Sequence, residues 1–91
     1  MFNFRLSDRL KGKIKKLRNR DQKKVEIINK RIREILNNDT TTIDRYKNLK
    51  YDLKHLKRVH IDKHFVLVFS VEKENNLVRF VDFDHHDNVY K

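Results

Sequence analysis

The sequence predicts an α+β fold, in which a hairpin of two helices packs on one face of a small, largely antiparallel sheet. Three observations predict it: a short alternating segment opens the chain, two amphipathic helical patterns follow, and the last third is rich in β-branched and aromatic residues. The expected order is β-α-α-β-β-β. One domain should span residues 1–91, because a chain of 91 residues is near the lower end of sizes that fold on a single core.

The first two elements are a short strand and a helix. A strand is expected at 2–6, where "FNFRL" alternates apolar and polar residues. Ser7 or Asp8 can then accept hydrogen bonds from the free N–H groups of a new helix. The apolar stripe of this helix comprises Leu10, Ile14 and Leu17. Its other face is almost entirely Lys and Arg.

A second helix follows after a very short turn. Residues 19–21 break the helical pattern, and Asp21 can cap the next helix, which ends near "NND" at 37–39. Its predicted buried face comprises Val25, Ile28, Ile32, Ile35 and Leu36. Because the turn is so short, the two helices should pack as an antiparallel hairpin.

The remainder of the chain predicts three strands. Residues 39–52 show no clear period and should connect the helices to the sheet. Strands are expected within 53–61, 64–72 and 76–83. The near-continuous apolar run of the middle one indicates a central strand covered on both faces, and "KENN" at 73–76 is a plausible hairpin turn.

The composition points to an anionic partner. There are 23 Lys and Arg against 13 Asp and Glu, a formal net charge of +10 at pH 7. Nucleic acid is the commonest partner of such a chain, although an acidic protein or an anionic membrane surface would use the same charge. The sequence contains no cysteine, which excludes disulfides, thiolate nucleophiles and cysteine-ligated metal sites. Without an apolar run long enough for a membrane span or signal peptide, we expect a soluble cytoplasmic protein with no membrane partner.

The strand expected at 53–61 carries the first candidate functional residues. Alternation sends one set of side chains to the open face and the other toward the helices. The first set is Lys54, Leu56, Arg58 and His60, and the second is His55, Lys57, Val59 and Ile61. Arg58 and His60 are therefore candidate phosphate contacts, with His60 a possible acid or base. The alternative is a solvated strand face that only keeps the protein soluble.

The chain ends in a cluster of titratable groups, "DHHD" at 84–87. Histidine changes charge near neutral pH, which suits an acid or a phosphate contact. The alternative is a frayed end without a task. A metal site is less favoured, because alternation along a strand should point His85 and His86 to opposite faces and a third ligand would have to come from elsewhere.

The order of elements, the segment "LKYDLKHLKRVHIDKHFVLVF" at 49–69 and the ending "HHDNVYK" at 85–91 together resemble the RelE/ParE superfamily of bacterial and archaeal toxins. The resemblance is greatest to RelE-type and YoeB-type mRNA interferases. Residues 58–61 match the family's basic, apolar, basic, Ile pattern, and 65–69 match the aromatic-flanked strand after its tight turn. The family's last strand typically ends in His-Arg-x-x-Val-Tyr, which corresponds here to residues 85–90.

This resemblance implies the toxin of a type II toxin–antitoxin system, which cuts mRNA in the decoding site of the ribosome and is neutralised by a cognate antitoxin. The reaction needs a base for the ribose 2′-OH, positive charge for the phosphorane and an acid for the leaving oxygen, so no metal or other cofactor is required. The expected catalytic residues are Arg58, His60, His86 and Tyr90. Expected RNA contacts are Lys11, Lys15, Arg18, Lys54, Lys57, Lys63 and His85.

Two positions depart from the family pattern. Val66 and His86 stand where the family usually has arginines that contact the scissile phosphate. The sequence therefore keeps a second function open: a non-catalytic toxin, or a ParE-like toxin that inhibits a DNA topoisomerase or binds RNA without cutting. Tyr90 could likewise be an aromatic clamp on the sheet edge, and the basic helical face could be merely solvated.

Overall fold

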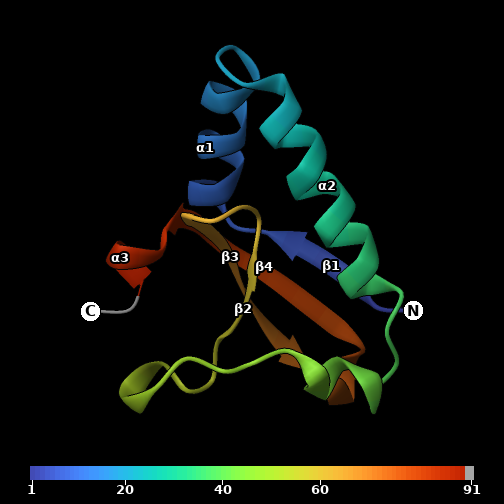
Figure 1. Ribbon diagram of the computed structural model, residues 1–91. Helices are drawn as coiled ribbons and strands as arrows, with labels where there is room; N and C mark the ends of the chain where they lie inside the picture. Colours follow the sequence, from blue (N-terminus) through green and yellow to red (C-terminus); the bar gives the residue numbers. More distant parts are fainter. Residues whose placement is uncertain (90–91) are drawn as a thin grey trace.

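The computed structural model describes residues 1–89 and confirms the α+β class and the expected element order, with one further turn of helix at the end (Figure 1). The helices are α1 (Asp8–Arg18), α2 (Gln22–Leu36) and α3 (His86–Val89), and three 3₁₀ turns lie at Thr42–Arg45, Tyr51–Leu53 and Lys73–Asn75. The strands are β1 (Asn3–Leu6), β2 (Lys57–His60), β3 (Phe65–Glu72) and β4 (Leu77–His85). Among these residues, no helix is long and apolar enough to cross a membrane.

Both helices of the hairpin begin at the residues that their sequences indicate. The Ser7 side chain accepts a hydrogen bond from the Leu10 N–H at 3.0 Å, and the Asp21 carboxylate accepts one from the Lys24 N–H at 3.0 Å. The Ser7 hydroxyl also donates to the Val81 carbonyl, which ties the start of α1 to β4. The predicted antiparallel helix pair therefore lies against the sheet (Figure 1).

The sheet is mixed, with strand order β1-β4-β3-β2. β3 pairs antiparallel with both β2 and β4, whereas β1 lies parallel to β4 at the edge. Asn76 closes the predicted β3–β4 hairpin in the left-handed region at φ 51°. β3 is therefore the inner strand whose apolar run the sequence indicates.

The core has two unequal parts, one on each face of the sheet. Most buried side chains lie between the helices and the sheet, including Leu10, Ile28, Phe69 and Phe80. On the opposite face, a smaller apolar cluster comprises Leu49, Val66 and Val68, with Leu56 and Val89 packed against it. The expectation that β3 is covered on both faces is thus confirmed.

The strand expected to begin at 53 begins four residues later. Residues 49–56 instead fold back as a loop, in which the Leu49 N–H donates to the Leu56 carbonyl and the Asn48 side chain donates to the Lys54 carbonyl. These bonds close the loop before β2 can start. Lys54 consequently lies in the loop and not on the face of a strand.

Candidate functional site

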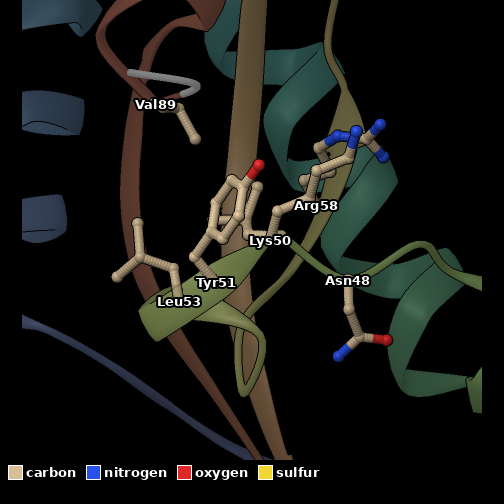
Figure 2. A pocket seen from close by; sticks show the side chains of 7 residues that line it. Asn48, Lys50, Tyr51, Leu53, Arg58 and Val89 are labelled. Carbon is tan, nitrogen blue, oxygen red and sulfur yellow. The ribbon is translucent and has the colours of Figure 1, made fainter.

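A hollow of about 290 Å³ lies on the face of the sheet opposite the helix hairpin (Figure 2). It is lined by Asn48, Leu49, Lys50, Tyr51, Leu53, Arg58 and Val89. These residues come from the 48–53 segment and the nearby strand β2, and from α3, which lies much later in the sequence. The small apolar cluster forms its floor, since Leu49 and Val89 belong to both.

Arg58 is the predicted catalytic residue that the structure places in this hollow. It is half-buried on β2 and its Cα pairs with that of Val68 on β3. Val89 of α3 lines the same hollow, so α3 lies beside Arg58. Tyr90, the predicted partner of Arg58, lies outside the described residues.

The hollow also contains residues that the sequence interpretation missed. Lys50 and Tyr51 belong to the segment without a clear period, and Tyr51 is 86% exposed. Its backbone φ is 58°, in the left-handed region that a bulky residue rarely adopts. The only sequence signal was a basic residue followed by an aromatic one in an irregular segment, a pattern too common to indicate a site.

Three histidines meet beside the end of β4. The rings of His85 and His86 are stacked with centroids 4.8 Å apart, and the His64 ring stacks on both at 5.6 and 6.3 Å. The prediction that alternation separates His85 from His86 is therefore wrong. β4 ends at His85 and α3 begins at His86, so the two side chains do not follow the period of a strand.

The turn before β3 supplies the third ring. The Asp62 carboxylate accepts hydrogen bonds from the N–H groups of His64 and Phe65, at 2.8 and 2.9 Å. The His86 N–H then donates to the His64 carbonyl at 2.7 Å, which fixes the start of α3 to this turn. Phe65 meets the His85 ring edge-on at 5.5 Å and anchors it to β3.

Carboxylates flank the histidines as the sequence suggests. The Asp87 carboxylate lies 3.5 Å from Nδ1 of His85 and 3.1 Å from Nδ1 of His86. A hydrogen bond from the Asn88 side chain holds the pKa of Asp84 below its usual value, with help from the His85 N–H and Lys13. Asp84 is thus a stable anion at this end of the sheet.

Other predicted residues lie away from the hollow. His60 is exposed at the end of β2 and does not line it, and its carbonyl accepts a hydrogen bond from the Arg31 side chain. Lys57 is buried, and its ammonium group is satisfied by hydrogen bonds that it donates to the Tyr46 carbonyl and to the Asn48 side chain. The charge of Lys57 therefore holds the 46–48 segment in place and is not presented on an open surface, contrary to the expected RNA contact.

Five of the predicted RNA contacts are exposed, and they lie in three parts of the fold. Lys11, Lys15 and Arg18 lie exposed on α1, across the sheet from the hollow. Lys54 lies in the 49–56 loop and Lys63 in the turn before β3, both exposed. These positions leave all five available to a large anionic partner.

Val66 is the residue at which the resemblance implies an arginine. It is fully buried on β3 in the small apolar cluster with Leu49 and Val68. Valine here supports the loop and α3, which a charged side chain could not do at the same depth.

Comparisons with solved structures first establish which class of fold this protein has. The structure is similar to YafQ from Escherichia coli (TM-score 0.73, 15% identity, all of both chains) and to a YoeB/ParE toxin from Agrobacterium tumefaciens (TM-score 0.75, 16% identity, 93% of this chain and 99% of that one). YoeB in complex with YefM from Staphylococcus aureus is also similar (TM-score 0.75, 22% identity, 94% and 98%). The fold is thus that of the small YoeB and YafQ toxins.

Two relatives are similar in sequence along their whole length. One is a protein of Methanocaldococcus jannaschii provisionally named toxin RelE4, 48% identical over 91 residues, which are all of this chain and 93% of the relative. The other is an uncharacterised protein of Methanosarcina mazei, 48% identical over 90 residues, which are 99% of this chain and all of the relative. No family model matches the chain. At this identity and coverage, the chain belongs to the RelE family of toxins.

Proposed function

We propose that this protein is the toxin of a type II toxin–antitoxin system and acts as a ribosome-dependent mRNA endoribonuclease. The observation that carries the proposal is the hollow that Arg58 of β2 lines together with Val89 of α3. An arginine held on a strand beside an open cavity can bind a phosphate in two-point contact. Membership of the RelE family supports the same activity.

The roles follow from the chemistry of ribose-assisted cleavage. Arg58 would stabilise the negative charge of the phosphorane as it forms. His86 and His60, neither of which lines the hollow itself, are the proposed base for the 2′-OH proton and acid for the leaving 5′-oxygen. Tyr90 would position the ribose or a base. Together these side chains can supply every role without a metal ion.

The RNA and the ribosome would be held mainly by charge. Exposed Lys54, Lys63 and the α1 residues Lys11, Lys15 and Arg18 are the proposed phosphate contacts, and His85 joins them beside the turn of His64. Such contacts position a nucleic acid without reading its sequence. Lys57 is no longer a candidate, because its ammonium group is buried and hydrogen-bonded.

The proposed protein partner is an acidic antitoxin that forms a hetero-oligomer with this chain. The net charge of +10 favours such a partner. Two structural neighbours, YoeB with YefM and YafQ with DinJ, were solved as complexes, which supports an assembly of this type.

The test is to induce the protein in cells and to map mRNA 5′ ends. Cuts inside translated regions with a fixed codon phase are expected, and single-turnover cutting of ribosome-bound mRNA should fall on the order of 10²-fold with Arg58→Ala or Tyr90→Ala. Arg79→Ala is the matched control, since Arg79 is an exposed strand arginine paired with Glu72 at 3.0 Å. Cleavage by Arg58→Ala at the rate of the parent would refute the proposed role of the hollow.

A second function is favoured by one specific observation. Val66 and His86 stand where the family usually has arginines, and Val66 is buried. A toxin that binds RNA without cutting it, or that inhibits a DNA topoisomerase in the manner of ParE, would leave mRNA ends unchanged on induction. Stalled replication with intact mRNA would therefore support this alternative over cleavage.

A further inference from the structure

We propose that His64, His85 and His86 form a binding site for one transition-metal ion of the zinc class. Each ring offers one nitrogen, and these three nitrogens lie within 4.8 Å of one another. Imidazole nitrogen is a preferred ligand of zinc, copper and nickel in proteins. Three protein ligands with an open fourth position are also the usual arrangement of zinc sites that remain accessible to solvent.

The distances fit an ion after small movements of the side chains. Zinc–nitrogen bonds of about 2.0–2.1 Å at tetrahedral angles place two ligand atoms about 3.3 Å apart. The three ligand nitrogens therefore need to approach one another by about 1.5 Å at most. His64 is exposed and can cover most of this distance by rotation of its side chain, while the side chains of His85 and His86 are 34% exposed.

The backbone around the three rings is already held in place. The 2.7 Å hydrogen bond from the His86 N–H to the His64 carbonyl joins the turn before β3 to the start of α3. Asp62 shapes that turn through the N–H groups of His64 and Phe65. A site whose backbone is fixed loses less entropy on binding than one assembled from free loops.

Asp87 supplies the kind of outer contact that zinc-bound histidines usually make. Its carboxylate oxygen lies 3.1 Å from Nδ1 of His86 and can accept a hydrogen bond from that nitrogen. This leaves Nε2 of His86 to bind the ion. The carboxylate also offsets part of the ion's charge in a strongly basic protein.

Metal binding would oppose the proposed cleavage. While Nε2 of His86 is bound to the ion, its lone pair cannot accept the 2′-OH proton, so His86 could not act as the base. This consequence rests on the proposed function, whereas the binding itself does not.

Isothermal titration of the chain without a histidine tag, using zinc chloride as the probe, tests the site. One ion should bind per chain, and His64→Gln should weaken binding by at least about tenfold, as should Asp87→Asn. His55→Gln is the matched control, because His55 is exposed on the 49–56 loop outside the group of three. Cobalt(II) should give the visible absorption of a tetrahedral complex with the parent and lose it with His64→Gln.

Three results would overturn the site: absence of zinc binding, equal affinity of His64→Gln and His55→Gln, or one ion shared by two chains. His64→Gln alters an exposed side chain, and its melting temperature establishes that it folds. In the cleavage assay, zinc should inhibit the parent and spare His64→Gln. Zinc that binds without inhibiting would keep the metal site and refute the catalytic role of His86, so the two proposals fail separately.

Discussion

Tyr51 combines an unfavourable backbone conformation with an exposed aromatic ring. A left-handed conformation costs a non-glycine residue about 1–2 kcal/mol, and an 86% exposed side chain recovers little of this through packing. The ring stands at the hollow with Arg58 and Lys50 (Figure 2). Aromatic rings beside basic groups bind unstacked bases, so under the proposed function Tyr51 would stack on a base of the RNA.

Tyr51→Gly should therefore separate stability from activity. Glycine adopts φ 58° without steric cost, so the free energy of unfolding should rise by about 0.5–1 kcal/mol. Cleavage of ribosome-bound mRNA should fall by about tenfold, since a lost base stack is worth about 1–3 kcal/mol. Tyr51→Phe keeps the ring and should retain most activity. A Tyr51→Gly variant that cuts like the parent would exclude the stacking role.

Residue-level prediction from sequence succeeded where the local period was regular and failed where it ended. The face of Arg58 was predicted correctly because β2 keeps strand alternation, whereas its catalytic role stays a prediction. The contact between His85 and His86 was missed because a strand changes into a helix between them. His64 could not be assigned at all, since only the folded turn brings it to the other two rings.

At the scale of elements, the 49–56 loop and α3 replace an open sheet face with a small covered core. Leu49, Leu56 and Val89 pack on Val66 and Val68, and the hollow beside Arg58 opens next to this cluster. The sequence indicated a covered β3 through its continuous apolar run. It could not indicate what covers it, because the loop is closed by bonds among 48–56 and by the buried ammonium of Lys57.

Val66→Arg, which restores the usual family arginine, should destabilise this protein. A charged side chain would replace a fully buried one, so we expect a loss of at least about 2 kcal/mol in the free energy of unfolding. Val66→Ala leaves only a cavity and should cost about 1–2 kcal/mol. Denaturant unfolding of the three proteins measures both. If Val66→Arg were as stable as the parent and cut mRNA faster, the structural role of Val66 would be refuted. Valine at this position would then only lower the activity.

The connection between α2 and the loop depends on two carboxylates. Asp39 accepts the N–H groups of Thr42 and Thr41, and Asp44 binds the Lys73 ammonium at 2.8 Å; these contacts lower the pKa of each carboxyl. Because the folded pKa values lie below the unfolded value of about 3.9, their stabilisation is present above that pH and is lost as pH falls through the folded values.

Asp39→Asn tests this linkage with a neutral side chain of the same shape. The variant should melt at a lower temperature than the parent near pH 7, and the difference should disappear as the pH falls below the folded pKa of Asp39. Melting curves between about pH 2 and 7 measure it. A constant difference at every pH would mean that geometry, and not the charge of Asp39, stabilises the turn.

At the scale of the whole molecule, the net charge follows directly from the sequence. Where that charge lies on the surface depends on the fold. The excess of ten positive charges is not confined to one face: Lys11, Lys15 and Arg18 lie on α1, while Lys50 and Arg58 lie at the hollow across the sheet. A partner that neutralises both regions must therefore contact more than one side of the domain. A partner that wraps around the chain would meet this requirement.

The last prediction is that the complex with the acidic antitoxin is tight and sensitive to salt. Basic groups on both sides of the sheet should attract the acidic partner over long distances, and dissolved ions screen that attraction with a Debye length of about 10 Å at 0.1 M. The dissociation constant should rise by at least about tenfold between roughly 0.05 and 0.5 M salt, chiefly through slower association. Lys11→Gln with Lys15→Gln should reduce this slope, whereas Val66→Ala should leave it unchanged. A dissociation constant that did not change with ionic strength would show that apolar packing, and not charge, selects the partner.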